Sequence, residues 1–379
     1  MRVLMVASVA SAILQFNMEN IRILCQLGHS VEVACNFEKG NNCSVQAVED
    51  LKRTLERMNV VYHQVYFARS PYNLLSIVSA YKALKLIVTS AQYGFIHCHT
   101  PLAGFLSRII AHKTNTPVIY TAHGFHFHKE GSILNWLIYY PIERILSNNT
   151  DVLILINSED YALAKRKMRA KRIEYVPGVG VAAQPICESR ESSSISRTDL
   201  GVPADAFLML SVGELNKNKN HELVIKAMAE LPTVHYVIAG KGDMGNHLRQ
   251  VADSLGVSPR LHLLGYRSDV QALYRLADVY CHPSFREGLS VAIMEAMANS
   301  LPIVCSDIRG NRDLVMPRKG GYLLSAISAQ AWSSAINELL RDPLKRAEMG
   351  KFNADHIKSF DISLVSEQMA RIYADMDTT

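Results

Sequence analysis

The sequence contains no apolar run of the roughly 18 to 20 residues that crossing a bilayer requires. Its seven cysteines are scattered and include no C-x-x-C pair, which argues against a disulfide framework and for a reducing compartment. Internal repeats, coiled-coil heptads and extended low-complexity segments are also lacking. These absences exclude membrane-spanning, fibrous and disulfide-stapled proteins. We therefore expect a cytoplasmic protein, and its 379 residues suggest two domains.

The first residues, MRVLMVASVASAIL, superficially resemble a secretion signal, with one charge, an apolar stretch and small residues. We interpret Arg2–Ala7 instead as a buried parallel strand, because its length and branching suit one. The residues that follow predict one amphipathic helix that ends at Gly28, a natural C-cap. Cleavage would then remove the first strand of a sheet.

Positive charge is concentrated in the first half of the chain. The net charge is +5, but residues 1–175 carry 19 Lys and Arg against 12 Asp and Glu, so the remainder is slightly acidic. Six basic residues lie between Lys165 and Arg172, where they form either a solvated helix end or a site for anionic headgroups. The apolar stretch Ile133–Leu146 could contact lipid, although we favour core packing.

Short apolar runs alternate with helical periods along the whole chain, which is typical of parallel α/β sheets. A polar, Ser-rich segment, residues 187–199, divides the runs into two series and predicts a surface loop. We expect two doubly wound units in tandem, with a ligand cleft facing the carboxyl ends of both sheets. The predicted strands are Arg2–Ala7, Val31–Cys35, Val60–Phe67, Phe95–His99, Val118–Thr121, Asp151–Asn157, Phe207–Val212, Tyr236–Ala239, Leu261–Leu264, Asp278–Cys281 and Pro302–Ser306.

Two glutamates, Glu287 and Glu295, lie eight residues apart in the string FREGLSVAIMEAMANSLPIVCSD. Gly288 permits a turn, and Leu289–Ala298 is rich in strong helix formers. One carboxylate therefore precedes a helix start, and the other lies about two turns inside the helix. Free N–H groups at that start, together with the helix dipole, can hold phosphate, and the carboxylates can accept hydrogen bonds from sugar hydroxyls. The pattern indicates a sugar-nucleotide site; the alternative is two unrelated surface carboxylates.

The segment resembles the E-x7-E signature of the retaining family 4 glycosyltransferases, which have the GT-B fold. The resemblance runs through most of the chain and is strongest between Leu208 and Val315, where SVGELNKNKNHELVIKAM, YVIAGKGDMGNHL, LHLLGYRSDVQALYRLADVYCHPSFREGLS and RGNRDLV follow the family's order and spacing. VIYTAHGFHFH and TDVLILINSEDYALAK match more loosely. The similarity is greatest to the branch that builds bacterial exopolysaccharide and capsule. It implies two Rossmann-like domains: 1–180 for the acceptor and 181–360 for the nucleotide sugar, with a helix at about 361–379 packing back on the first.

Three residues are the candidates for catalysis: Glu287, Lys219 and His123. Lys219 follows a strand and opens a helix, so it can oppose the negative charge that builds up as a diphosphate leaves; the alternative is a solvated helix start. The family uses an Arg as well, but this chain has Glu214 at that position, and Lys217 is the candidate replacement. His123 ends a strand, where the resemblance implies contact with the donor sugar; otherwise it caps the strand.

The resemblance implies that the nucleotide sugar binds Glu295 through its ribose and Glu287 through its sugar hydroxyls. Tyr266 and Arg267 occupy the base-binding corner, or else form a plain turn. The implied nucleotide-sugar set is Gly213, Lys217, Gly240, Gly265, Tyr266, Arg267, Ser284, Gly288, Leu289, Ser290, Glu295, Asn311 and Arg312.

A metal ion is not expected. The histidine strings around His97, His99 and His123 suggest zinc as an alternative, but no Cys or carboxylate accompanies them at the usual spacing. The only D-x-D string, Asp375–Asp377, lies at the C-terminal end, where we expect a frayed tail. We therefore expect metal-independent transfer and no cofactor.

We predict a cytoplasmic retaining glycosyltransferase that uses a UDP-sugar and a lipid-linked saccharide acceptor in cell-surface polysaccharide synthesis. The basic N-terminal half predicts peripheral binding to an anionic membrane at its inner face, and no nucleic-acid partner is expected. Two alternatives stay open: a UDP-N-acetylhexosamine 2-epimerase on the same fold, and a non-catalytic binding subunit, which Glu214 would favour.

Overall fold

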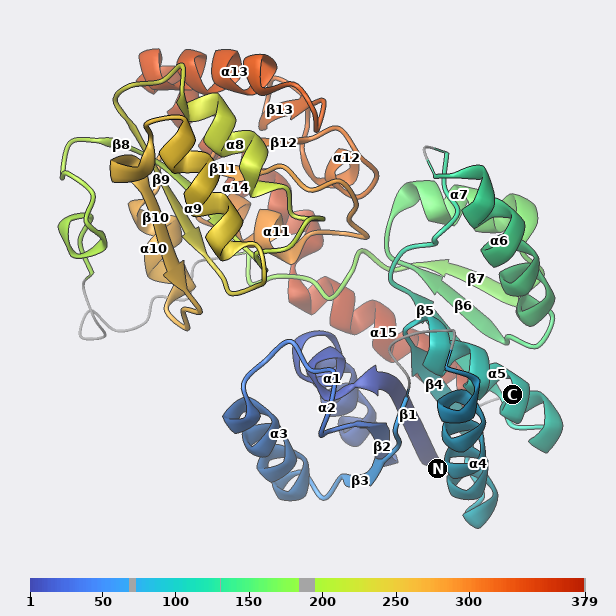
Figure 1. Cartoon of the computed structure of the whole chain (residues 1–379). Coiled ribbons are helices and arrows are strands. Elements are labelled where there is room, and N and C mark those ends of the chain that lie inside the picture. The colour runs from blue at the N-terminus through green and yellow to red at the C-terminus, as the bar shows by residue number, and fades with distance from the viewer. Residues whose placement is uncertain (68–72, 130, 184–194, 378–379) are drawn as a thin grey trace. The chain divides into compact units, whose positions relative to one another are not determined.

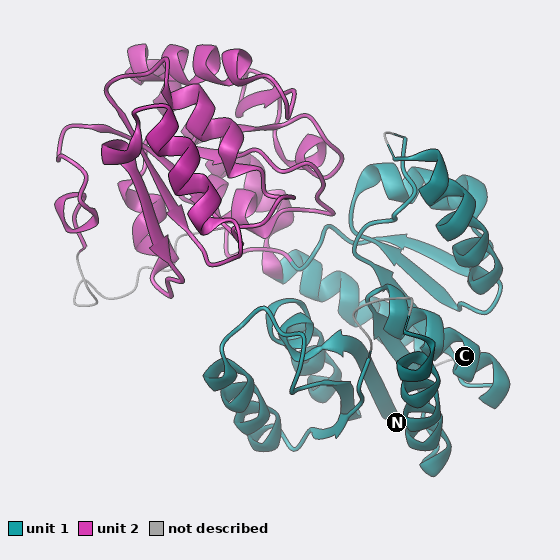
Figure 2. Cartoon of the chain, viewed as in Figure 1, with its two compact units in different colours: residues 1–179, 363–379 teal, residues 180–362 magenta. Residues whose placement is uncertain are grey.

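A computed structural model describes residues 1–67, 73–129, 131–183 and 195–377 and divides the chain into two compact α/β units (Figures 1 and 2). Unit 1 contains residues 1–179 and 363–379, and unit 2 contains residues 180–362. Most of the predicted Ser-rich loop lies outside the described residues. The two predicted α/β sheets are confirmed.

Unit 1 is built on a seven-stranded sheet with the order β3-β2-β1-β4-β5-β6-β7, and all its strand pairs are parallel. Its elements are β1 (Arg2–Val9), α1 (Ala10–Phe16), α2 (Met18–Gln26), β2 (Ser30–Asn36), α3 (Val45–Arg57), β3 (Val61–Gln64), α4 (Leu74–Ser90), β4 (Phe95–His99), α5 (Pro101–Thr114), β5 (Val118–Ala122), α6 (Ile133–Ser147), β6 (Val152–Leu155), α7 (Ser158–Lys167), β7 (Arg172–Tyr175) and α15 (Ile362–Met376).

Unit 2 is built on a six-stranded parallel sheet with the order β10-β9-β8-β11-β12-β13. Its strands and α-helices are β8 (Phe207–Val212), α8 (His221–Met228), β9 (Val234–Ala239), α9 (Gly245–Ser254), β10 (Leu261–Gly265), α10 (Val270–Leu276), β11 (Val279–His282), α11 (Val291–Ala298), β12 (Ile303–Ser306), α12 (Asn311–Leu314), β13 (Gly321–Leu324), α13 (Ala329–Arg341) and α14 (Pro343–His356). Short 3-10 helices are Thr198–Leu200, Ser258–Arg260 and Ile357–Phe360.

Both sheets reverse their direction of winding beside the first strand of the unit. In unit 1 the reversal lies between β1 and β4, and in unit 2 it lies between β8 and β11. Helices cover both faces of each sheet, so the central strands are almost wholly buried and read as continuous apolar runs, whereas edge strands such as β7 and β10 are half-buried. Parallel α/β sheets bind their ligands beyond the carboxyl ends of the strands at such a reversal.

The last helix, α15, belongs to the core of unit 1. Its apolar face, including Met369 and Tyr373, packs with residues of β1 and α2. The Tyr373 hydroxyl lies 2.8 Å from Nδ1 of His97 on β4, and Gln368 donates a hydrogen bond to the carbonyl of Tyr175. Without this helix one face of the first sheet would lose part of its cover.

Several predicted boundaries are wrong. The single helix expected after the first strand is two helices, because Asn17 interrupts it and its buried side chain donates to the carbonyl of Ala12. The third predicted strand, residues 60–67, is shorter, and two strands at the sheet edges, β7 and β13, were not predicted. The helix expected from Leu289 begins at Val291, so Glu295 lies about one turn inside it rather than two.

Candidate functional site

Two loops of unit 2 meet at the reversal of its sheet. One follows β8 and spans residues 213–220, and the other follows β11 and spans residues 283–290. The backbone N–H of Phe285 donates to the carbonyl of Asn218 at 2.8 Å, and the Asn218 side chain donates to the carbonyl of Arg286 at 3.0 Å. Asn220 likewise donates to the carbonyl of Pro283 at 3.1 Å. The loops that carry Lys219 and Glu287 are therefore held together as one structure.

Glu287 receives two donors on a single oxygen. Lys219 Nζ lies 2.7 Å from Glu287 Oε1, and His282 Nε2 lies 3.0 Å from the same atom. The Ser284 hydroxyl lies 3.2 Å from His282 Nε2. Neither donor binds Oε2, so the carboxylate keeps an oxygen that can accept a hydrogen bond from a ligand. The structure thus brings together Glu287, Lys219 and Ser284, which the sequence singled out separately.

Charge at this cluster is set by burial and by the neighbouring Lys219 and His282. Burial opposes the ionised form of Glu287, whose side chain is 14% exposed, but Lys219 and His282 outweigh it and hold the pKa of Glu287 well below its ordinary value. Burial lowers the pKa of His282, although contact with Glu287 partly offsets this effect. Glu287 is therefore ionised at neutral pH, and a neutral His282 carries its proton on Nε2, where the carboxylate accepts it.

Glu295 has a different environment, although it follows Glu287 by only eight residues in the sequence. Burial raises its pKa, and a hydrogen bond from the Tyr274 hydroxyl to Oε2, 3.0 Å long, partly lowers it again. Tyr274 lies on α10 and also donates to the carbonyl of Ala292 at 3.2 Å. In the part of unit 2 that the structure describes, no cation pairs with Glu295, which makes its charge costly until a ligand arrives.

Glycines allow the loops at this sheet edge to approach each other closely. A Cβ on Gly240 would lie 1.7 Å from the carbonyl oxygen of Gly213, and a Cβ on Gly310 would lie 2.2 Å from that of Gly288. Gly265 has a positive φ of 71° and forms a bridge with Gly240. Larger residues at Gly240 or Gly310 would push apart the backbone segments that carry the candidate site.

The start of α11 is capped from within. The Ser290 hydroxyl accepts from the N–H of Ile293 at 3.4 Å, and both Ser290 and Leu289 are buried. This cap uses one of the four N–H groups that have no partner inside a helix. The Ser290 side chain therefore stabilises the helix start, and the backbone rather than the hydroxyl remains for an anion.

Four more predicted residues lie near the ends of β10 and β12: Tyr266 and Arg267 on the loop after β10, and Asn311 and Arg312 at the start of the short helix α12. Tyr266 is 64% exposed, and Arg267 forms a two-pronged ion pair with Asp269. Asn311 is buried and donates to the carbonyl of Ser306 at 3.0 Å, and Arg312 donates to a carboxylate oxygen of Asp307 at 2.6 Å. Each of these contacts is local, so they shape the loops that border the site.

Lys217 lies apart from the cluster. It is exposed and lines a surface groove of about 680 Å³ with residues of α8 and α9, a groove whose lining includes neither Lys219 nor Glu287. Glu214 is exposed as well. Among the described residues, no hydrogen bond or ion pair joins Lys217 to Lys219 or Glu287, so its role as the replacement cation stays a prediction.

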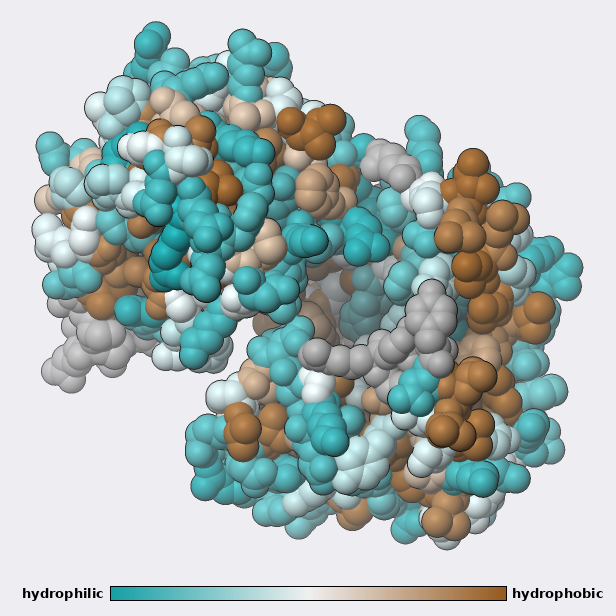
Figure 3. Space-filling view, in the orientation of Figure 1, coloured by the Kyte–Doolittle hydropathy of each residue, from teal (hydrophilic) through white to brown (hydrophobic). Residues whose placement is uncertain are grey.

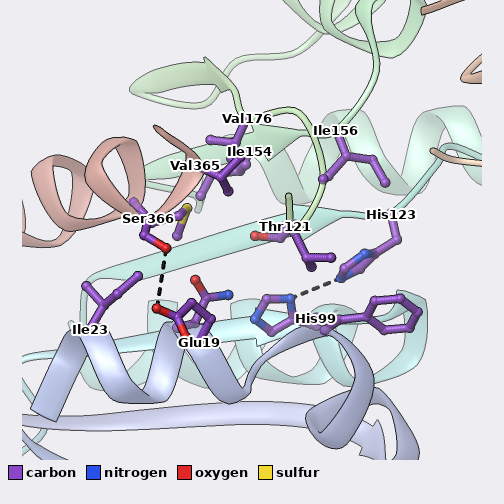
Figure 4. A pocket seen from close by; sticks show the side chains of 15 residues that line it. Glu19, Ile23, His99, Thr121, His123, Ile154, Ile156, Val176, Val365 and Ser366 are labelled. Atoms are coloured by element: carbon purple, nitrogen blue, oxygen red, sulfur yellow. Dashed lines mark hydrogen bonds between the residues drawn. The ribbon is translucent and has the colours of Figure 1, made fainter. Parts of the chain in front are cut away.

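In unit 1, His123 follows β5, is half-buried and lies beside the buried His99 (Figure 4). Its Nε2 lies 3.1 Å from Nδ1 of His99, and the two rings border a small cavity of about 30 Å³, enough for a water molecule. Burial lowers the pKa of His123 to about 4, so the ring is neutral at pH 7. Glu19 and Ser366 line the same cavity (Figure 4).

His97, His99 and His123 do not have the chemistry of a zinc site. His97 uses both ring nitrogens, Nδ1 with the Tyr373 hydroxyl and Nε2 with Thr121 Oγ1, each at 2.8 Å. Within the described residues, no group of three or more His, Cys, Asp or Glu side chains could hold a metal ion. In the same residues, no helix is both long and apolar enough to cross a bilayer.

Sequence reasoning missed two residues that contact the predicted ones, His282 beside Glu287 and Tyr274 beside Glu295, and considered His99, which lies beside His123, only as a zinc ligand. His282 and His99 both end strands, and the same signal had singled out His123. Tyr274 gave no signal, because only the packing of α10 against α11 brings its hydroxyl to Glu295.

Comparisons with known proteins match both units. A model of the glycosyl transferases group 1 family matches residues 192–356, and a glycosyl transferase 4-like domain matches residues 15–178. The putative glycosyltransferase EpsD of Bacillus subtilis (strain 168) is 36% identical over 325 residues, which cover 82% of this chain and 84% of the relative. The chain belongs to the group 1 glycosyltransferases. The predicted family is thereby confirmed.

Other relatives of this glycosyltransferase have more specific names. An Escherichia coli UDP-Gal:alpha-D-GlcNAc-diphosphoundecaprenol alpha-1,3-galactosyltransferase is 26% identical over 314 residues, which cover 80% of each chain. Among solved structures, Anabaena Alr3699/HepE in complex with UDP-glucose matches with a TM-score of 0.77 and 20% identity, over 99% of this chain and 100% of the other. The structural match confirms the GT-B fold.

Proposed function

We propose that this glycosyltransferase transfers a sugar, with retention, from a UDP-sugar to a lipid-linked saccharide in bacterial cell-surface polysaccharide synthesis. It would act in the cytoplasm at the inner face of the membrane. The observation that carries the proposal is the Lys219–Glu287 pair at the reversal of the second sheet, on the loops beside the start of α11, with Glu295 about one turn inside that helix. The names of two relatives, one a UDP-galactose transferase to a diphosphoundecaprenol acceptor, support the donor and acceptor classes.

The pair suits a leaving nucleoside diphosphate. Lys219 brings a positive charge to the loop, and its ammonium has three donors, so it can keep Glu287 and still bind a phosphate oxygen. As the bond from the anomeric carbon to the phosphate oxygen breaks, negative charge grows on that oxygen, and Lys219 and the free N–H groups of α11 stabilise it. The charge that a metal would otherwise supply comes from these groups, so we propose transfer without a metal.

Glu287 and Glu295 have separate roles in this proposal. The open oxygen of Glu287 accepts from hydroxyls of the donor sugar, while Lys219 and His282 fix its other oxygen. Glu295, which lacks a cation partner among the described residues, accepts from the ribose. We assign no protein nucleophile, because attack by the acceptor on the face of the departing phosphate needs none. For His123, a neutral ring, contact with the donor sugar stays a prediction of the family resemblance.

The family match supports transfer over the epimerase alternative. An experiment distinguishes an enzyme from a non-catalytic binding subunit. The enzyme should release UDP from a UDP-sugar in the presence of acceptor, and changing Glu287 should abolish this release.

Two variants test the division of roles. Glu295→Ala should weaken UDP binding, whereas Glu287→Ala should weaken UDP-sugar binding and turnover and leave UDP binding nearly intact. Each loss should be roughly 1.5–3 kcal/mol, the range for hydrogen bonds to charged groups. Calorimetric titration with UDP and with several UDP-sugars measures both, and Glu348→Ala, at an exposed position of α14, is the matched control. Equal loss of UDP affinity in both variants would show that the assignment is wrong.

A further inference from the structure

Helix α6 exposes an uninterrupted aliphatic face. Its outward positions recur at helical spacing, and every one is apolar: Ile133, Leu134, Leu137, Ile138, Pro141, Ile142 and Ile145. Of these, Ile133 is 79% exposed and Leu137 is 69% exposed. The sequence had favoured core packing for this stretch, which is wrong for its outer half. The opposite half, which includes Trp136 and Tyr140, packs against the core.

A second helix of unit 1 carries a similar surface. On α4, Leu74, Leu75, Val78 and Leu86 are exposed, and Leu75 is 86% exposed. Figure 3 shows hydrophobic residues gathered along α6 and again over α4, on one side of unit 1. A patch of this extent on a soluble unit marks a surface that another apolar phase or partner covers.

Positive charges predominate on and beside these two helices. Helix α4 contains Lys82 and Lys85 and no acidic residue, and the single acid of α6, Glu143, is occupied by the buried Arg108 at 2.8 Å. The carboxyl end of α6 adjoins the basic cluster, because Arg144 donates to the carbonyl of Lys167 and the N–H of Arg169 donates to Ser147.

Half of that basic cluster is available to a partner. Lys171 and Arg172 are paired with carboxylates, 2.7 Å and 3.0 Å away. Among the described residues, no acid pairs with Lys165, Arg166 or Lys167 in the last turn of α7. An aliphatic ridge with cations at its border is complementary to a bilayer with anionic headgroups.

We propose that α6 and the neighbouring face of α4 form a membrane-docking surface, on which α6 lies in the plane of an anionic lipid interface. Its 15 residues extend about 22 Å, too short to span a bilayer but suited to lying on one. The half-buried Trp136, Tyr139 and Tyr140 provide the aromatic side chains common at such interfaces. A second copy of the chain fits less well, because a two-fold interface on this face would bring the same basic residues close together.

The inference deepens the proposed function, since a lipid-linked acceptor has its lipid in the bilayer. The test is co-sedimentation of the full chain with vesicles of phosphatidylcholine, with or without phosphatidylglycerol. Leu134→Gln combined with Leu137→Gln should lower the partition coefficient by roughly tenfold or more, because two leucine side chains lose their burial in lipid. Val45→Gln combined with Leu344→Gln changes two equally exposed aliphatic residues, on α3 and α14, and should leave binding unchanged.

Two further measurements separate the outcomes. The α6 variant should keep wild-type UDP affinity and wild-type turnover of a short, water-soluble acceptor, and lose turnover only of acceptor embedded in vesicles. Failure of turnover by the wild type on both acceptors, with vesicle binding intact, would count against the proposed function and not against the docking surface. Equal vesicle binding by the wild type and the α6 variant would overturn the docking surface. The docking surface would also be overturned if light scattering showed a wild-type dimer that the α6 variant cannot form, while neither protein bound vesicles.

Discussion

The two glutamates of the site should respond in opposite ways to the loss of their charge when no ligand is bound. In Glu287→Gln, Lys219 loses its carboxylate, and the unfolding midpoint should fall. Charge-assisted hydrogen bonds contribute about 1.5–3 kcal/mol; since Lys219 still contacts water, we expect about 1.5–2 kcal/mol, or roughly 3–8 °C for a unit of this size. In Glu295→Gln, a half-buried charge that no cation among the described residues pairs with disappears, while the amide oxygen can still accept from Tyr274, so the midpoint should rise.

The pH dependence follows from the directions of the two pKa shifts. The folded-state pKa of Glu287 is lowered, so its stabilisation is fully present above the unfolded value, near 4.5, and is lost as the pH falls through the folded value. The pKa of Glu295 is raised, so its charge destabilises the fold as the pH rises from 4.5 through the higher folded value. Both variants should therefore differ from the wild type most at neutral pH, with opposite signs, and converge toward it in acid.

Thermal unfolding followed by circular dichroism, without ligand, at pH 7 and at acidic pH measures both effects. A titration with UDP should accompany it, because Glu295→Gln is expected to gain stability and lose UDP affinity together. If Glu295→Gln melts below the wild type by as much as Glu287→Gln does, Glu295 is a structural acceptor for Tyr274 and not a charge held ready for a ligand.

Two other predictions concern the metal and the basic cluster. Transfer activity should survive EDTA, since Lys219 supplies the charge opposite the diphosphate; a requirement for Mg²⁺ or Mn²⁺ in nucleotide binding would contradict this. Reversing the charges of Lys165, Arg166 and Lys167 should reduce binding to anionic vesicles and leave UDP affinity unchanged, at about 1 kcal/mol for each residue near the surface. The electrostatic contribution of these residues to vesicle binding should shrink as the salt concentration rises, because screening at 0.15 M acts over about 8 Å. If the vesicle binding of wild type and variant depended on salt in the same way, this prediction would be contradicted.

The alternation of apolar runs was sufficient to predict most strands of both sheets, because strands buried on both faces must be continuously apolar. The strands it missed, β7 and β13, are short edge strands. β7 has the sequence RIEY and is only half-buried, so its pattern does not differ from that of a loop. Asn17 looked like an ordinary helix residue, and only its buried contact with Ala12 explains the break.

The sequence by itself also singled out the candidate residues of the site. Lys219 and Glu287 were recognisable because each lies on a loop between a strand and a helix, and Glu295 because it follows about one turn inside that second helix; the chain's local order fixes these positions. Their partners His282 and Tyr274 were not, since contacts between distant segments depend on how α10 packs and how the two loops meet.

Tertiary structure alone decided whether the apolar stretch of α6 is covered. A helix that is apolar on most sides has the same sequence whether protein or lipid lies against its outer face, because periodicity records which residues share a face and not what lies opposite them. In this fold α6 covers the core with its aromatic half and leaves Ile133, Leu137 and Ile145 exposed.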